Sequence, residues 1–176
     1  MVMNNYAKNG FTSITSMGIT TSDKKVIHLY DHISSQKSSF VNDMLSTIGI
    51  LPERNHTVRN FVFVRYDAAH LLPSSSKNGD DFFKIVGIKF WYDGSPYTGS
   101  MYLEKPYLEN YFTKNVLHFP PAHSGSPLLT KDQLGSLIAE YQAAEWQVAV
   151  HTQGDMSTRE VIDTFEKLNT NSEIDY

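Results

Sequence analysis

The chain has 176 residues, with 15 basic and 19 acidic side chains and a formal net charge of −4. This length fits one domain, and a hydrophobic content of 40% is enough for a packed core. The acidic balance disfavours nucleic-acid binding, and the absence of cysteine excludes disulfides, thiolate metal sites and cysteine nucleophiles. No apolar run approaches the ~20 residues of a membrane span, and no secretory signal begins the sequence, so we expect a soluble, cytoplasmic protein.

The first half of the chain alternates between strand and helix patterns. Residues 5–8 are consistent with the end of a helix that Gly10 stops, and the β-branched residues of 11–19 predict a short buried strand. Apolar residues at helical spacing predict a helix over 34–48, closed by Gly49. Apolar runs predict two further strands, over 57–66 and 85–92.

The second half begins with a long irregular segment, residues 93–129, whose many aromatic side chains argue against disorder. Thr130 and Gln133 form a capping-box pattern at the start of a helix that we expect to end near Glu145. A short buried strand is predicted over 147–151. The last predicted helix begins at a second capping box, residues 157–160.

These elements predict an α/β fold with about four strands in a parallel sheet. Ligands of such folds bind at the carboxyl ends of the strands, so the polar residues there are the first candidates for chemistry. Those residues include Asp67, His70, Lys89, Asp93 and His151.

Lys89 and His151 are the two residues that most need an explanation. His151 ends an apolar strand, where its imidazole could bind a metal or could form an ordinary hydrogen bond at the start of a loop. Lys89 lies inside an apolar strand, where a charge is costly to bury. It could be a Schiff-base amine, a base with a lowered pKa or a carbamylated metal ligand. Alternatively it could face water on an edge strand or pair with Asp93.

The other histidines carry weaker signals. His28 and His32 would share one face of a helix, but no glutamate completes the helical zinc motif, and the segment could equally be extended and solvated. Glycine-rich phosphate loops and the Gly-x-Ser-x-Gly elbow are absent from the sequence. The remaining histidines read as loop residues or have no partner in the sequence: His56, His70, His118 and His123.

Two blocks of sequence, residues 86–95 (VGIKFWYDGS) and 145–155 (EWQVAVHTQGD), resemble family 3 of the amidohydrolases, a group of metal-dependent hydrolases. In that family a "VK–DG" strand precedes a long insertion, a helix and a "GWQVAVHAxGD" strand, in the order seen here. Residues 6–14 (YAKNGFTSI) are similar to an earlier "GxTS" strand of the family. The resemblance covers nearly the whole chain.

The resemblance implies a (β/α)8 barrel whose metal ligands come from several strands. Lys89 matches the fourth-strand ligand, which is a carboxylated lysine or an acid in the family, and His151 matches the fifth-strand ligand. It further implies a divalent metal, commonly zinc, that activates water for attack on an amide-type carbon. The resemblance assigns no general base to this chain.

The chain also departs from the family pattern. It contains no His-x-His motif, and Glu145 stands where the family usually has glycine. A whole barrel takes about 250 residues. We therefore expect residues 1–176 to be a single segment of a TIM barrel, about strands 2–5, without its N- and C-terminal parts. Such a segment could be a fragment of a longer product, a truncated gene, or a chain that another chain completes.

The functional hypothesis is a metal-dependent hydrolase of carbon–nitrogen bonds in a small amide-type substrate, inactive as an isolated segment. The alternative is a non-catalytic α/β module that oligomerises or binds a partner. A flavodoxin-like domain also fits the order of elements, but its phosphate loop is missing. We expect no nucleic-acid or membrane partner, and a homo-oligomer is possible.

Overall fold

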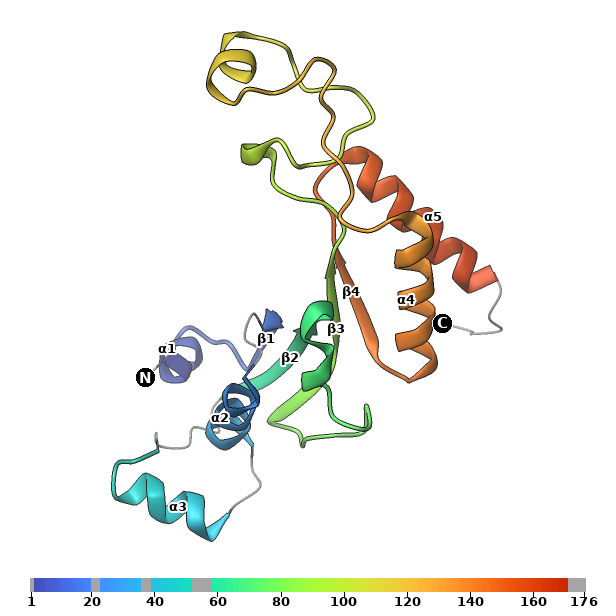
Figure 1. Cartoon of the computed structure of the whole chain (residues 1–176). Coiled ribbons are helices and arrows are strands. Elements are labelled where there is room, and N and C mark those ends of the chain that lie inside the picture. The colour runs from blue at the N-terminus through green and yellow to red at the C-terminus, as the bar shows by residue number, and fades with distance from the viewer. Residues whose placement is uncertain (1, 20–22, 36–38, 52–57, 171–176) are drawn as a thin grey trace. The chain divides into compact units, whose positions relative to one another are not determined.

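The fold is built on a parallel β-sheet. The computed structural model describes residues 2–19, 23–35, 39–51 and 58–170. Within those ranges its four strands are β1 (Ser13–Ile19), β2 (Arg59–Arg65), β3 (Phe83–Trp91) and β4 (Gln147–His151) (Figure 1). They lie in the sheet in the order β1-β2-β3-β4, and β2 pairs in parallel with both β1 and β3. Helices or helical turns separate successive strands along the chain, so the predicted α/β fold is confirmed.

The chain forms two compact units. The first comprises Met1–Lys89 and Ala144–Ala149, and the second comprises Phe90–Ala143 and Val150–Tyr176. β3 and β4 each begin in the first unit and end in the second. In the described part of the chain, no helix has the length and apolar content that crossing a membrane requires.

The first unit packs its core around β2 and β3. Val58, Val62, Val64 and Ile88 have no exposed surface, which fits the strong strand preference of branched side chains on buried parallel strands. β1 is less buried than its sequence predicts, because exposed and half-buried residues alternate along it and only Ile19 is buried. The reason is its place at the edge of the described sheet, where it has one neighbouring strand.

Among the described residues of the first unit are three α-helices, α1 (Val2–Lys8), α2 (Lys24–Ser34) and α3 (Phe40–Thr47), and a 3-10 helix over Tyr66–Leu71. α1 ends before Gly10, whose φ of +83° is the left-handed conformation expected of a helix stop. The single helix predicted over 34–48 is wrong in its first part, since Ser35 is extended and α3 begins after Ser39. Serine favours such helix ends because its hydroxyl competes for backbone hydrogen bonds. Residues 36–38 of that prediction lie outside the described residues.

The second unit contains α4 (Lys131–Ala143) and α5 (Asp155–Thr170). Leu134 and Ile138 lie one turn apart on α4 and are fully buried, as the apolar periodicity predicts. The rings of Phe90 and Tyr141 also pack together, with centroids 6.0 Å apart.

The two predicted capping boxes have different outcomes. The first is confirmed: the Gln133 N–H donates to Thr130 Oγ1 at 3.2 Å, and the Thr130 N–H donates to Gln133 Oε1 at 2.9 Å. The second is wrong, because α5 begins at Asp155 and Ser157 lies inside the helix. The Ser157 hydroxyl donates instead to the carboxylate of Asp93 and to the carbonyl of Gly154.

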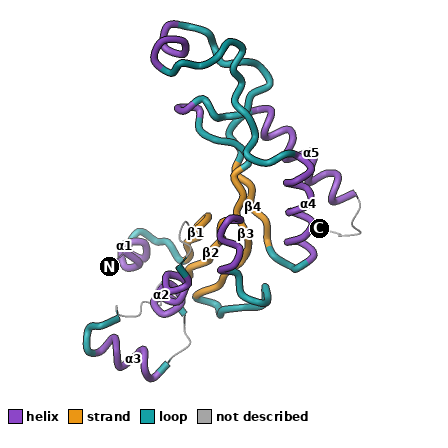
Figure 2. The backbone as a smooth tube through the Cα atoms, viewed as in Figure 1, coloured by secondary structure: helices purple, strands orange, loops and turns teal. Residues whose placement is uncertain are grey.

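Residues 93–129, here called the insert, connect β3 to α4. Figure 2 shows the insert mostly as loop, with short helical turns at Pro96–Thr98 and Phe112–Val116. Backbone hydrogen bonds hold it together, from Leu103 to Ser124 and from Tyr107 to His123, both 2.8 Å long. The prediction of a long but ordered irregular segment is therefore confirmed.

Candidate metal centre

Lys89 lies near the end of β3, in the first unit. Only 8% of its surface is exposed, and β3 has a neighbouring strand on each side. The interpretation of Lys89 as a water-facing residue on an edge strand is therefore wrong. Burial removes water from the ammonium group and lowers the pKa of Lys89. A buried lysine of this kind is shifted toward its neutral, nucleophilic amine form.

His151 is the last residue of β4 and belongs to the second unit. Its side chain is half-buried, and its backbone carbonyl accepts a hydrogen bond of 3.0 Å from the Tyr92 N–H. Within the described residues, the imidazole itself makes no hydrogen bond to a protein group. Both ring nitrogens therefore remain available to a ligand, and a neutral imidazole is a common metal donor.

The carboxylate of Asp93 holds the turn that follows His151. Its Oδ1 accepts from the Gln153 N–H at 2.8 Å, and its Oδ2 accepts from the Gly154 N–H at 2.9 Å. Two more donors reach Oδ2 from the insert and from α5, namely the Tyr102 N–H at 2.9 Å and the Ser157 hydroxyl at 2.8 Å. Asp93 is 1% exposed, so these neutral donors replace the water that a buried carboxylate loses. Among the described residues, the partners of the Asp93 carboxylate are these four donors and not Lys89, the partner considered from the sequence.

Gly154 and Asp155 fasten the insert to the same turn. A Cβ at position 154 would overlap the carbonyl of Tyr102, so only glycine fits there. Asp155 Oδ1 accepts from the Glu104 N–H at 3.0 Å and from the Met156 N–H at 2.8 Å, and the first of these bonds lowers the pKa of Asp155 most. The Gly-Asp pair of the second sequence block thus has a structural role in the second unit.

The other histidines of the described residues belong to no ligand cluster. His28 and His32 both lie on α2, so the extended alternative is wrong; His28 is exposed, whereas His32 is buried with a contact of 3.0 Å to Ser46 Oγ. His56 lies outside the described residues. Among the described residues, no three His, Cys, Asp or Glu side chains are grouped so that they could hold a metal. Within those residues, the remaining three histidines, His70, His118 and His123, are likewise members of no such group.

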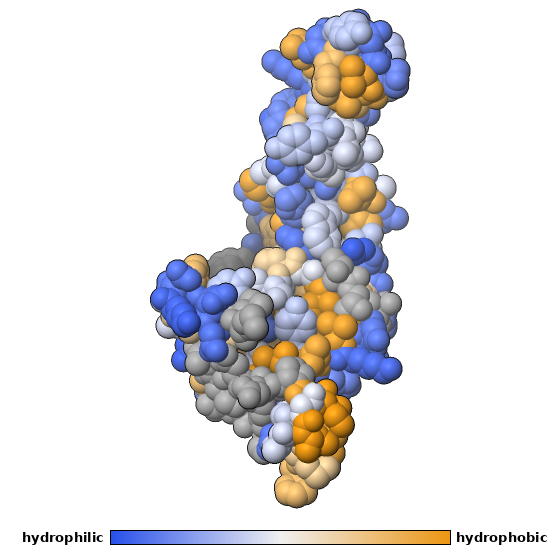
Figure 3. Space-filling view, turned by 90° about the vertical axis from the view of Figure 1, so that its left-hand side faces the viewer, coloured by the Kyte–Doolittle hydropathy of each residue, from blue (hydrophilic) through white to orange (hydrophobic). Residues whose placement is uncertain are grey.

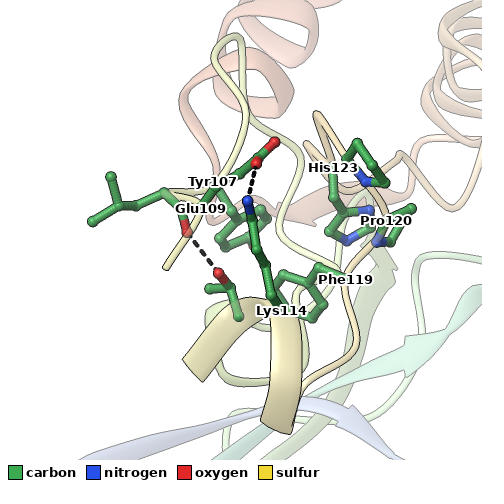
Figure 4. Close-up of a pocket in the computed structure, with 9 residues that line it drawn as sticks. Tyr107, Glu109, Lys114, Phe119, Pro120 and His123 are labelled. Carbon is green, nitrogen blue, oxygen red and sulfur yellow. Dashed lines mark hydrogen bonds and ion pairs between the residues drawn. The ribbon is translucent and has the colours of Figure 1, made fainter. Parts of the chain in front are cut away.

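A small pocket of about 170 Å³ opens in the insert (Figure 4). Three rings pack beside one another at one side of it: Tyr107 stacks on His123 with centroids 5.6 Å apart, and Phe119 lies 4.7 Å from His123. Across the pocket, Lys114 pairs with Glu109 at 2.7 Å. The lining of the pocket therefore combines aromatic rings with one ion pair.

Comparison with known proteins identifies the family to which the chain belongs. The family model described as "Amidohydrolase family" matches residues 2–174. The chain belongs to the amidohydrolase family. Two solved structures of uncharacterised metal-dependent hydrolases are similar to it in fold, one from Pyrococcus horikoshii OT3 (TM-score 0.59, 20% identity) and one from Pyrococcus furiosus (TM-score 0.60, 22% identity). No curated protein matches the chain.

This amidohydrolase chain spans less than a third of those solved structures. The alignments cover 94% and 95% of this chain but 29% and 30% of the two hydrolases. The four described strands with their intervening helices therefore correspond to part of an amidohydrolase-like fold, as the sequence predicts.

The donor chemistry of Lys89 and His151 fits a divalent metal only in part. An imidazole without a hydrogen bond and a buried amine that can become an anionic carbamate are suitable ligand types. A divalent metal needs at least four ligands. The described residues contain no group of three or more His, Cys, Asp or Glu side chains that could complete such a shell.

Sequence reasoning missed the connecting role of Asp93. It placed Asp93 among the polar residues at the ends of the strands and considered it as a partner for Lys89. The groups that donate hydrogen bonds to Asp93 are mostly backbone amides, from Tyr102, Gln153 and Gly154. Nearly every residue type has a backbone amide, so the sequence does not indicate which amides bind Asp93. The one available signal was an aspartate directly before glycine at the end of a buried strand, which marks a tight turn.

Proposed function

We propose that this chain supplies Lys89 and His151 as metal ligands to a hydrolase that cleaves carbon–nitrogen bonds in small amide-type compounds. The observation that carries the proposal is the burial of Lys89, which lies on an inner strand and has a lowered pKa. The nitrogen of a neutral amine can form a bond to the carbon of carbon dioxide and release one N–H proton to the solvent, and the resulting carbamate is an anionic oxygen ligand. The proposal explains why a lysine is buried here although burial of its charge costs stability: its carbamate would serve as a metal ligand.

The roles of the chain's own residues follow from their surroundings. Lys89 would bind through its carbamate oxygens, and His151 through a ring nitrogen. A divalent metal, for which we propose zinc, supplies an activated water and polarises a carbonyl when it is bound. Because the described residues contain too few donors for a full shell, we expect the isolated chain to show no turnover.

The insert is proposed to receive the apolar part of the substrate. Its pocket is walled by Tyr107, Phe119 and His123, and its volume of about 170 Å³ is that of a single ring. Exchange of residues 93–129 between related enzymes should then carry substrate preference with it. Unchanged preference after the exchange would remove this part of the proposal.

The carbamate on Lys89 can be tested directly in this chain. The protein is equilibrated with ¹³C-labelled bicarbonate near neutral pH, and the carbamate carbon is observed by NMR. We expect one carbamate signal in the wild-type chain that Lys89→Arg abolishes. Lys84→Arg is the matched control, because Lys84 lies on the same strand but is only half-buried. A signal that persists in Lys89→Arg would contradict the proposal.

A second candidate function is a non-catalytic module that associates through α3. On this helix Phe40, Val41 and Met44 are 84%, 57% and 48% exposed, and Ile48 beside it is 61% exposed. The hydrophobic group at the lower end of Figure 3 is this surface. Exposed apolar patches commonly mark protein contacts.

Light scattering over a range of concentrations separates the two candidates. Self-association that Phe40→Ser abolishes, together with no carbamate on Lys89, would favour the module. A carbamate on Lys89 in a monomeric chain would favour the hydrolase.

A further inference from the structure

The two residues that follow Trp91 hold the backbone of His151 and the turn after it. The Tyr92 N–H donates to the His151 carbonyl at 3.0 Å, and the next residue along the chain, Asp93, accepts from the amide of Gln153 at 2.8 Å. The amide of Gly154 reaches the same carboxylate at 2.9 Å. The end of β3 therefore fixes both the last residue of β4 and the turn that leaves it.

The same carboxylate reaches the insert and α5. Asp93 Oδ2 accepts from the Tyr102 N–H at 2.9 Å and from the Ser157 hydroxyl at 2.8 Å. The Ser157 N–H in turn donates to the Tyr102 carbonyl at 3.4 Å. One buried charged group thus joins the insert, the turn after His151 and the first turn of α5.

We propose that Asp93 is a positioning residue that holds the His151 imidazole in place for metal binding and couples that position to the insert. The inference rests on the proposed function of His151 as a ligand. A metal ligand must be held near its productive geometry, and the groups that hold it affect metal affinity nearly as much as the ligands do. Asp93 acts through backbone amides, so its effect on His151 passes through the turn.

A carboxylate suits this task better than an amide of the same shape. A carboxylate offers about four acceptor positions and no donor, and hydrogen bonds to a charged acceptor are the stronger kind. An asparagine can present its oxygen where Oδ2 lies, toward Tyr102, Gly154 and Ser157. Its NH₂ group must then face the Gln153 N–H, donor against donor. Asp93→Asn therefore removes the hydrogen bond to Gln153, in the turn after His151, and weakens the hydrogen bond to Tyr102, in the insert, less.

The first measurement uses metal-free protein and amide hydrogen exchange. In Asp93→Asn we expect about a tenfold loss of protection at the Gln153 amide, from the loss of a charge-assisted bond. The Tyr102 and Gly154 amides should change less, and the His151 ring signals should broaden or shift. The matched control is Asp80→Asn, since Asp80 accepts from the amides of Phe82 and Phe83 in the other unit.

The second measurement titrates Co²⁺ alone and follows the His151 ring signals. Asp93→Asn should raise the Co²⁺ midpoint of His151 about tenfold, whereas Asp80→Asn should leave it unchanged. The inference is overturned if the Gln153 amide and the His151 ring are unaffected in Asp93→Asn, or if the control Asp80→Asn changes them as much as Asp93→Asn does. If Co²⁺ never selects His151 in the wild type, the proposed function fails, and Asp93 is judged on the metal-free measurement alone.

A milder variant covers the case in which Asp93→Asn does not fold. Ser157→Ala removes one donor to Oδ2 from a fully buried side chain without changing the charge. We expect protection of the Tyr102 and Gly154 amides to fall while Gln153 keeps its bond to Oδ1. Equal loss at all three amides would contradict separate roles for the two carboxylate oxygens.

Discussion

Glu145 occupies a backbone conformation that disfavours a side chain. Its φ is +61°, in the left-handed region, at the turn between α4 and β4. A Cβ in this region costs about 1 kcal/mol through its contact with the following carbonyl oxygen. The resemblance to amidohydrolases already marked position 145 as one where glycine is usual, and the backbone gives the physical reason.

Replacement of Glu145 by glycine should stabilise the chain. We expect Glu145→Gly to raise the free energy of unfolding in urea by about 1 kcal/mol, because glycine carries no Cβ. Glu145→Ala is the control: it removes the exposed 3.8 Å contact with Lys77 but keeps the Cβ. An equal gain in Glu145→Ala would show that the side chain, and not the backbone, was responsible.

Gly154 is a position where glycine is present and a larger residue would not fit, whereas Glu145 is a position where glycine would be favoured but is absent. A Cβ added at this position would overlap the carbonyl of Tyr102, so Gly154→Ala must push the insert away from the turn after β4. We expect a loss of about 1–3 kcal/mol in the free energy of unfolding, the usual cost of overpacking. Gly135→Ala on α4 is the control, because its new Cβ would meet Thr164 Cγ2 at an ordinary 3.5 Å. That variant should gain ~1 kcal/mol from helix propensity.

At the scale of elements, the capping box of α4 makes a measurable contribution. Thr130 and Gln133 satisfy two amides that the first turn of the helix would otherwise leave open. Thr130→Ala should lower the free energy of unfolding by about 1 kcal/mol, and Thr130→Ser should cost far less because it keeps the hydroxyl. Equal losses in the two variants would locate the effect in the methyl group.

The attachment of the insert to α5 should weaken in acid. Bonds from the Glu104 and Met156 amides lower the pKa of Asp155, and the ion pair of Glu104 with Arg159 lowers the pKa of Glu104. For a lowered carboxyl pKa, the stabilisation is complete above the ordinary value, 3.8 for Asp155, and is lost as the pH falls through the lowered value. Exchange protection of the Glu104 amide, corrected for intrinsic rate, should therefore fall below about pH 4. In Asp155→Asn this pH dependence should be weaker; an identical acid profile would contradict the assignment.

Sequence patterns predicted the elements better than their ends and contacts. The apolar run of β2 and the box at Thr130 are local signals, and both are confirmed. The second box failed because Ser157, a good capping residue, was used for a contact with Asp93 from 64 residues away. Such a partner leaves no local trace. The exposure of Phe40 could not be predicted either, because helical spacing shows which residues share the apolar face of α3 but not what packs against that face.

The candidate site was predicted in the same uneven way. Lys89 stood out because a lysine inside an apolar strand conflicts with its surroundings, and its burial confirms that conflict. His151 was predicted as a ligand from its place at a strand end; the strand end is confirmed, and the ligand role stays a prediction. The group that holds its turn, Asp93, was not found, because its partners are backbone amides.

At the scale of the whole molecule, the chain belongs to the amidohydrolase family and forms two compact units. It covers about 30% of the solved hydrolases that it resembles in fold, and the described residues group no three acidic or histidine donors. Lys89 and His151 are the donors we assign to a metal. Their assignment is the central claim, and it does not require turnover to be tested.

The most direct test is a Co²⁺ titration of the wild-type chain, followed by NMR of the histidine rings in bicarbonate buffer. We predict that the His151 ring signals broaden at lower Co²⁺ than those of His28, which is exposed on α2 and serves as an internal reference. Lys89→Met should raise the His151 midpoint to that of His28. If His151 responds no earlier than His28 in the wild type, or if Lys89→Met changes nothing, the assignment of these two residues as metal ligands is wrong.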